Sequence, residues 1–163
     1  MNATDSQRCL DRFRAYAAAF ETAFATNDWS VLAPYFTPDA TSELNGDSVH
    51  GGDAIVATLR DAVAMFDRRF DSRQHRIVAG PEIRDGRVYM KAVVRYERAG
   101  LAPLEVIGEE WFTFDGDRIA THVDRVLNVA DVMAYLGQHN DALLPFVPYA
   151  EPHATSVGAS ASR

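Results

Sequence analysis

The sequence predicts one α+β domain, in which helices cover the concave face of a strongly curved antiparallel sheet. Apolar residues recur three and four positions apart over the first 70 residues, which is the spacing of amphipathic helices. Between about 74 and 127, apolar and polar residues tend to alternate in segments separated by short turns, as in antiparallel strands. A chain of 163 residues, 47% of them hydrophobic, has enough material for one core. The helices must therefore pack on one face of the sheet.

Three helices are expected before the sheet. One apolar stripe marks the first, formed by Leu10, Phe13, Ala17, Phe20 and Phe24. Asn27 is expected to end this helix, and Asp28 to cap a short second helix that reaches Phe36. Asp53 is expected to cap a third helix, whose buried face extends to Phe70.

Short strands follow, and a final helix closes the domain. A turn at 37–39 leads into a strand over 40–44. Four longer strands are expected at about 74–83, 87–97, 104–114 and 118–127. The last helix covers roughly 129–136 and ends at Gly137, a residue type favoured just after a helix.

Composition limits the possible functions. Residues 1–150 are expected to form the domain and 151–163, rich in Ala and Ser, a flexible tail. No membrane span or signal peptide is recognised, so a cytoplasmic protein is expected. The single cysteine, Cys9, excludes an internal disulfide, and no metal or phosphate motif occurs, so no cofactor or metal is expected. A net charge of −7 argues against nucleic acid, and the basic residues within 68–73 lie at a helix end that favours cations.

Strand alternation predicts which side chains face the interior. In 88–96 the even positions are the apolar ones, namely Val88, Met90, Ala92, Val94 and Tyr96. The length of the turn near 115–117 then decides which residues of the last two strands share that face. A three-residue loop places Glu110 opposite His122, whereas a two-residue loop places Trp111 there.

The three-residue loop has a consequence for assembly. It places three apolar side chains on or beside the outer surface of the sheet, Trp111, Val123 and Leu127. A large apolar outer surface predicts a homodimer.

Polar residues that could converge inside are His75, Glu110, His122 and Asp124, with Tyr16 from the first helix. A carboxylate and an imidazole in an apolar pocket have the ingredients of general acid–base catalysis, because burial raises the carboxyl pKa. Each residue also has an ordinary structural interpretation. His75 and the His122–Asp124 pair could be surface residues, Glu110 could pair with Arg95, and Tyr16 could belong to the core.

Four phrases, FTPDATSEL, HGGDAIVATL, FTFDGDRI and DRVLNVADVMAYLG, resemble the NTF2-like superfamily and its SnoaL-like branch. The resemblance covers roughly residues 8–140. It implies a cone of helices and sheet around an apolar pocket, often dimeric through the outer sheet face. Related folds carry a pocket carboxylate at the position of Asp124, which favours the three-residue loop.

No characterised branch of this superfamily is matched completely. The resemblance to scytalone dehydratase implies a catalytic role for His75, but Arg98 stands at the position of the second histidine. Limonene epoxide hydrolases share only Asp124, since Ala92 and Val94 replace their Arg–Asp pair. Ketosteroid isomerases would need other residues at Phe20 and Leu44, and only Glu110 aligns near their second acid.

Two functions therefore remain open. The first is a cofactor-free lyase, isomerase or cyclase, dehydratase-like, acting on a small hydrophobic oxygenated molecule. His75 and Asp124 would move protons and share a hydrogen bond directly or through one water or substrate oxygen, while His122 and Glu110 polarise an oxygen. The predicted substrate contacts are Tyr16, Phe20, Leu44, Met90, Val94, Tyr96, Val106 and Phe112. The second function is a non-catalytic ligand-binding or association module.

Overall fold

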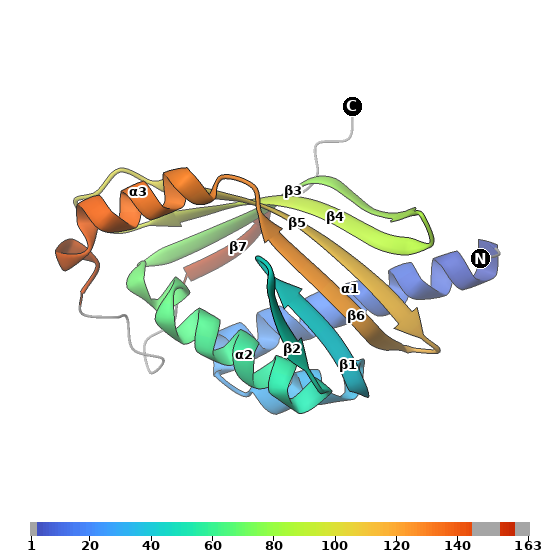
Figure 1. The fold of residues 1–163 in the computed structure, drawn as a ribbon. Helices are drawn as coiled ribbons and strands as arrows, with labels where there is room; N and C mark the ends of the chain where they lie inside the picture. The colour runs from blue at the N-terminus through green and yellow to red at the C-terminus, as the bar shows by residue number, and fades with distance from the viewer. Residues whose placement is uncertain (1–2, 145–153, 159–163) are drawn as a thin grey trace.

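The computed structural model describes residues 3–144 and 154–158 and has the expected α+β architecture (Figure 1). Its helical elements are α1 (Ala3–Thr26), η1 (Trp29–Tyr35), α2 (Gly52–Met65), η2 (Asp67–Arg69), α3 (Val129–His139) and η3 (Asp141–Leu143). Its strands are β1 (Phe36–Leu44), β2 (Asp47–His50), β3 (Ser72–Arg84), β4 (Arg87–Glu97), β5 (Leu104–Asp115), β6 (Arg118–Val126) and β7 (Ala154–Gly158). No helix in these two described ranges has the length and apolar character needed to cross a membrane.

One sheet contains all of these strands, in the order β2-β1-β6-β5-β4-β3-β7. The expected antiparallel meander, β3 through β6, is confirmed. Two parallel pairs were not expected, β1 beside β6 and β7 beside β3. Of the predicted tail, 151–163, the structure describes only 154–158, as β7, and the rest lies outside the described residues.

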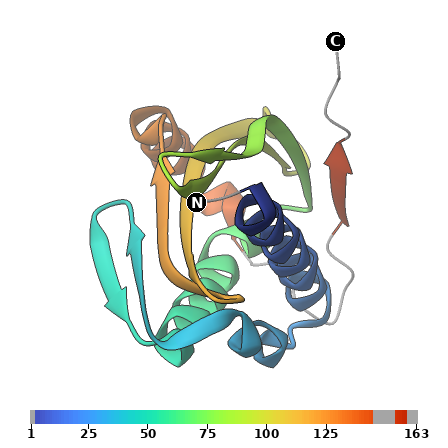
Figure 2. The ribbon, with the colours of Figure 1, turned by 90° about the vertical axis from the view of Figure 1, so that its right-hand side faces the viewer.

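The helices lie on the concave side of the sheet. Figure 2, viewed nearly along α1, shows the sheet curving over this helix. Phe13 and Phe24 of α1 join Ile55 of α2 and Phe112 of β5 in one buried cluster. Burial of such side chains contributes about 1.5–3 kcal/mol each. The core therefore fixes α1 and α2 against the inner face.

Several predicted boundaries require correction. Asn27 has a φ of 60° just after α1, and Asp28 accepts a hydrogen bond from the Ser30 amide, so both expected caps are confirmed. The cap of α2 is Gly51, and Asp53 lies in its first turn. Gly137 lies inside α3, which continues to His139.

The start of the sheet also differs from the expectation. β1 begins at Phe36, so the expected turn at 37–39 is instead part of a strand. The residue types of Thr37 and Pro38 suggested a turn, but pairing of Phe36 with Ile119 of β6 extends the strand.

The hairpin between β5 and β6 begins in the two-residue register and, beyond a shift, follows neither prediction. Asp115 pairs with Arg118 across a two-residue loop, and the register then shifts by one residue beside Ala120. This β-bulge restores the pairing of even with even positions. Glu110 therefore lies opposite Asp124 and Phe112 opposite His122. The expected direct pairing of Glu110 with His122 is wrong, as is the alternative pairing of Trp111 with His122, but the predicted faces are correct.

Candidate functional site

A cavity of about 510 Å³ lies between the inner face of the sheet and helices α1, α2 and α3. Its volume is in the range of pockets that hold small organic molecules. The four predicted catalytic side chains all line it, His75, Glu110, His122 and Asp124. Six of the predicted substrate contacts line it too, Tyr16, Phe20, Met90, Val94, Tyr96 and Val106. Strand alternation thus located the cavity wall correctly.

Leu44 and Phe112 are not part of the wall. Phe112 is fully buried and stacks under the His122 ring, with 4.6 Å between ring centroids and 8° between planes. It supports the cavity wall from behind. Leu44 ends β1, which lies beyond β6, and Asn45 in the following turn lines the cavity instead.

Two hydrogen-bonding partners, Glu110 and Ser42, hold the His122 ring in a fixed orientation. These three residues form the first polar cluster of the cavity. Its Nε2 lies 3.2 Å from Glu110 Oε2, and its Nδ1 lies 3.3 Å from the hydroxyl of Ser42 on β1. With Nε2 protonated, the ring donates to the carboxylate and Nδ1 accepts from Ser42. The sequence did not identify Ser42, because its approach depends on the parallel pairing of β1 with β6.

Asp124 lies beside this pair on the same face. Burial in the cavity wall and the charge of Glu110 raise the pKa of Asp124 to about 7, against the opposing effect of His122. A carboxyl with this pKa can accept or release a proton near neutral pH. The site therefore has a base in reach of an imidazole–carboxylate pair.

Tyr16 brings a hydroxyl to the same region from α1. Its ring is buried against Phe36 and Phe112, with centroid distances of 5.6 and 5.7 Å. Burial and the nearby charges of Glu110 and Asp124 raise the pKa of Tyr16 well above its usual value. The hydroxyl thus stays protonated and can donate a hydrogen bond to a ligand oxygen. Tyr16 belongs both to the core and to the cavity wall.

His75 does not form a direct hydrogen bond with Asp124, although both side chains line the cavity as expected. It lies on β3, opposite Val94, and burial together with the charge of Arg73 lowers its pKa. Across the described part of the chain, no hydrogen bond joins His75 to Asp124, whose charged neighbours are Glu110 and His122. The order β6-β5-β4-β3 separates the two strands, so any link between the residues would have to pass through a ligand.

A second polar cluster, which the sequence did not indicate, lines the same cavity. Arg73 on β3 binds both carboxylate oxygens of Glu21 on α1, at 2.8 and 2.9 Å. Its Nε lies 3.6 Å from Asp67 Oδ1, and the Tyr96 hydroxyl donates to that same oxygen at 2.9 Å. Burial raises the pKa of Asp67 to about 6, against the opposing effect of Arg73.

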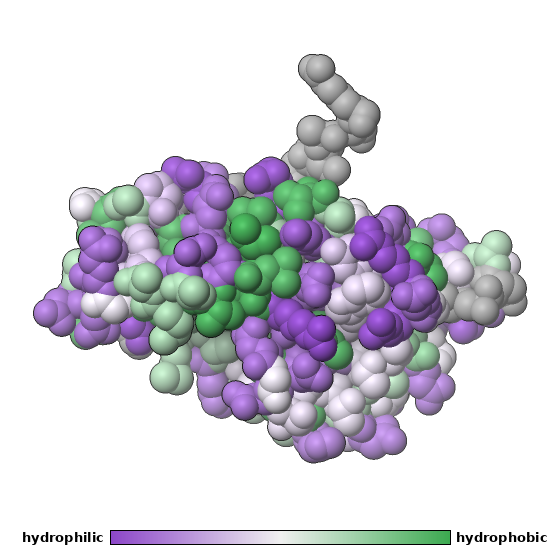
Figure 3. All heavy atoms as spheres, turned by 45° about the horizontal axis from the view of Figure 1, so that its top comes forward, coloured by the Kyte–Doolittle hydropathy of each residue, from purple (hydrophilic) through white to green (hydrophobic). Residues whose placement is uncertain are grey.

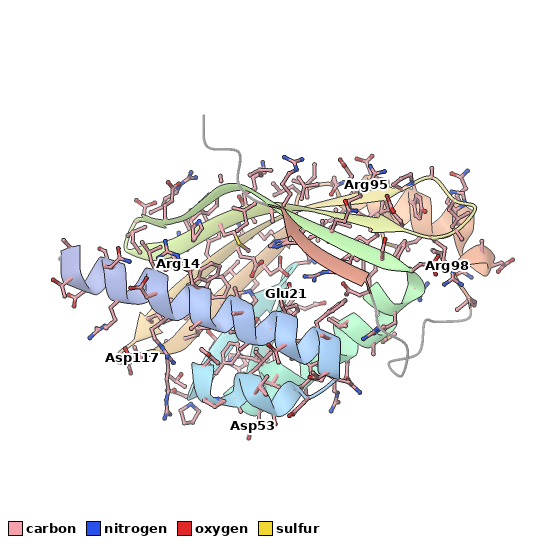
Figure 4. The ribbon with its side chains drawn as sticks, turned by 180° about the vertical axis from the view of Figure 1, so that it is seen from behind. Arg14, Glu21, Asp53, Arg95, Arg98 and Asp117 are labelled. Atoms are coloured by element: carbon pink, nitrogen blue, oxygen red, sulfur yellow. The ribbon has the colours of Figure 1, made fainter. Side chains whose placement is uncertain are left out.

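The second cluster was missed for a physical reason. The basic residues within 68–73 were interpreted as helix-end cations, whereas Arg73 begins a strand and points inward opposite Tyr96. Figure 4 shows Glu21 on the α1 side of the sheet and Arg95 on the other side. Arg95 pairs with Glu97 and Glu105 there, and not with Glu110 as one interpretation proposed.

The side chains of the cavity do not include a recognisable set of metal ligands. In residues 3–144 and 154–158, no group of three or more His, Cys, Asp and Glu side chains is arranged to hold a metal ion.

A curved sheet that closes over helices around an apolar cavity defines the NTF2-like class of folds. Within that class, the chain belongs to the SnoaL-like domain family, whose model matches residues 14–122. No curated protein matches the sequence.

Solved structures of similar fold share little sequence with the chain. A SnoaL-like polyketide cyclase candidate from Jannaschia sp. CCS1 has a TM-score of 0.64 at 13% identity, over 82% of this chain and 94% of that one. An LEH-like epoxide hydrolase from M. tuberculosis has a TM-score of 0.58 at 17% identity, over 86% and 97%. AclR, a hydroxylase candidate from Streptomyces galilaeus, has a TM-score of 0.57 at 16% identity, over 80% and 98%. These similarities establish the fold.

Proposed function

We propose that the chain is a cofactor-free acid–base enzyme of the lyase, isomerase or cyclase type, acting on a small hydrophobic molecule that carries oxygen. The observation that supports this most strongly is Asp124, a largely buried carboxyl with a pKa raised to about 7 beside Glu110 and His122. Family membership is consistent with dehydratase or cyclase chemistry. The apolar wall, which includes Met90, would hold the carbon skeleton of the ligand.

The proposed reaction begins with proton transfer from carbon. The Asp124 carboxylate removes a proton from a carbon next to a ligand carbonyl, and the electron pair moves onto the carbonyl oxygen. Tyr16, which is protonated and buried beside the acids, donates a hydrogen bond to that oxygen. The proton then returns to a different carbon in an isomerisation, or leaves with a hydroxyl group as water in a dehydration.

In this proposal, Glu110 and His122 adjust the pKa of the base, Asp124, in opposite directions. Their hydrogen bond fixes the imidazole beside Asp124, and the protonated Asp124 carboxyl gives its proton to a departing hydroxyl group. His75, on the other side of the cavity, would contact the ligand without acting as the partner of Asp124. We therefore expect His75→Ala to reduce turnover less than Asp124→Asn does.

Hydrogen–deuterium exchange tests the proposal without knowledge of the natural substrate. A panel of apolar cyclic ketones is incubated with the protein in D2O, and deuterium at the carbon next to the carbonyl is measured by mass spectrometry. We expect exchange with at least one ketone, and a fall of about a hundredfold or more in Asp124→Asn with little change in affinity. Asp39→Asn, an exposed aspartate on β1, is the matched control.

The same experiment distinguishes an enzyme from a binding module. If ketones bind in the cavity but wild-type protein and Asp124→Asn show the same background exchange, the carboxyl is not a base. The protein would then be a binding protein of this fold.

A further inference from the structure

The cavity has two polar ends with His75 between them. The charges that act on Asp124 come from Glu110 and His122. Those that act on Asp67 come from Arg73 and Glu21, whereas Arg73, Glu21 and Glu110 all act on His75, which also lines the cavity.

Strand β4 runs from one end to the other. Its Met90 pairs with Glu110, and its Tyr96 pairs with Arg73. At about 3.3 Å per residue, this part of β4 measures about 20 Å along the strand. Alternate side chains between them, Ala92 and Val94, form an apolar wall.

The end formed by Glu21, Asp67, Arg73 and Tyr96, here termed the Asp67 end, has its donors engaged. Two guanidinium nitrogens of Arg73 donate to Glu21, and the Tyr96 hydroxyl donates to Asp67. A carboxylate has about four acceptor positions; Oδ1 of Asp67 faces Tyr96 and Arg73, and the backbone N–H of Asp67 itself also donates to the carboxylate. Acceptor capacity therefore remains on the Asp67 carboxylate, which lines the cavity.

The donors at the Asp67 end favour the same kind of ligand group. Glu21 and Asp67 supply two negative charges, and two guanidiniums balance them, Arg73 and Arg68, which is buried against the same Phe24 ring as Arg73. The hydroxyl of Tyr96 and two nitrogens of Arg73 are already engaged with these carboxylates, so an anionic ligand group would have to compete for them. A hydroxyl group or a protonated amine would instead supply a donor to the Asp67 carboxylate.

We propose that the Asp67 end binds a hydrogen-bond-donating group, a hydroxyl or a protonated amine, at the far end of an elongated apolar ligand. The orientation of such a ligand, with its reacting carbon at Asp124, rests on the function proposed above. The preference for a donor at the Asp67 end does not rest on it.

A set of biphenyl compounds tests the preference. Dissociation constants are measured by equilibrium dialysis at pH 7.5 for 4-biphenylmethanol, 4-biphenylmethylamine, 4-biphenylcarboxylate and 4-ethylbiphenyl, which has the shape of the alcohol without its donor. For each protein, the affinities of the alcohol and the amine are divided by that of 4-ethylbiphenyl. This ratio cancels general changes in the apolar wall.

In Asp67→Asn, the amide oxygen can still accept from Tyr96 and Arg73, while a donor NH2 replaces the other carboxylate oxygen. We expect the ratios for the alcohol and the amine to fall by about tenfold or more, as for a lost hydrogen bond to a charged group. The carboxylate should gain affinity. Asp39→Asn should leave every ratio unchanged.

Two results would overturn the inference. One is an unchanged ratio in Asp67→Asn protein that is folded by circular dichroism. The other is a fall of the alcohol and amine ratios in Asp124→Asn but not in Asp67→Asn, which would place the donor group of the ligand at the Asp124 end.

A structure of the wild-type protein with 4-biphenylmethylamine serves if Asp67→Asn does not fold. The amine nitrogen should lie within hydrogen-bond distance of Asp67, and a nitrogen beside Asp124 would refute the proposal. Deuterium exchange remains the separate test of catalysis, so a failed exchange experiment does not affect this one.

Discussion

Asp124 illustrates how the environment of one residue can give it a function. An aspartate on a strand surface would be ionised at neutral pH, but this one faces an apolar cavity and shares its cross-strand row with Glu110. Desolvation and like charge both oppose its ionisation. The pairing of even with even positions across the β5–β6 hairpin, which the family resemblance favoured, predicted that Asp124 points inward. Its pKa follows from what lies around it.

The raised pKa predicts how stability depends on pH. Folded Asp124 keeps its proton up to about pH 7, whereas the ordinary value is 3.8, so the folded state binds more protons between these values. The stabilisation is full below pH 3.8 and is lost as pH rises through 7. Asp124→Asn has no titrating carboxyl and does not lose this stabilisation. We therefore expect the difference in melting temperature, mutant minus wild type, to be more positive at pH 8 than at pH 4.

Asp67 contributes in the same direction up to about pH 6, but it is present in both proteins and cancels from the comparison. Scanning calorimetry at the two pH values measures the difference. An equal difference in melting temperature at pH 4 and pH 8 would show that Asp124 titrates normally.

At the scale of elements, β3 and β4 come unusually close at Gly80. This glycine has a φ of 75°, and a Cβ placed there would lie 2.3 Å from the Tyr89 carbonyl oxygen. The register of the two strands shifts on either side of it. Close backbone approach at a bulge is a position that requires glycine.

Replacing this glycine should therefore destabilise the domain strongly. We expect Gly80→Ala to reduce the free energy of unfolding by more than about 2 kcal/mol. The alanine would have to keep a φ that is unfavourable for it, and the Tyr89 backbone would have to move away from the added carbon. Gly86→Ala is the matched control, because Gly86 has a φ of 74° but nothing within 4 Å of the added carbon. Urea denaturation measures both, and equal losses would show that the close approach is unimportant.

The elements themselves were largely predictable, and their exceptions have physical causes. Alternation located β4 because its two faces meet different environments, one apolar and one solvated. The bulge beside Ala120 has no such signature, since a single extra alanine leaves the local pattern unchanged. The three-residue loop predicted from Asp115-Gly116-Asp117 therefore assigned the correct faces. It placed Glu110 opposite His122, whereas its actual partner, Asp124, lies two residues further along β6.

At the scale of the molecule, the outer face of the sheet carries a group of aromatic and apolar side chains. Trp111 lies beside Tyr89, with 4.4 Å between ring centroids, and Val123 is its cross-strand partner. Arg84 and Arg87 lie over the two aromatic rings. Figure 3, which brings the top of Figure 1 forward, shows hydrophobic side chains gathered among hydrophilic ones.

We propose a homodimer through the outer sheet face, because contact between two copies would remove the partly exposed Trp111 and Val123 side chains from water. Light scattering should give a mass near twice the 18.0 kDa of the chain, and Trp111→Arg should give a monomer. Met65→Arg, a change at an exposed methionine on α2, should leave the dimer intact. A wild-type monomer at high micromolar concentration would contradict the proposal.

Long-range pairing explains what the sequence could not predict about the whole molecule. The parallel contact of β1 with β6 brings Ser42 to His122 across 80 positions of sequence. The bond between Glu21 and Arg73 likewise joins α1 to β3. The residue types of Asp124 and His122 suggested a site, whereas these supporting residues carry no local pattern.

A titration of Asp124 in the wild-type protein examines the proposed base itself. The side-chain carboxyl of 13C-labelled protein is followed by NMR from pH 3 to pH 9 and assigned with Asp124→Asn. We expect Asp124 to titrate near pH 7, so that a base and its proton coexist in the cavity at neutral pH. A midpoint near the ordinary value of 3.8 would contradict it, because the carboxyl would then be a solvated charge and the acid–base site would not exist.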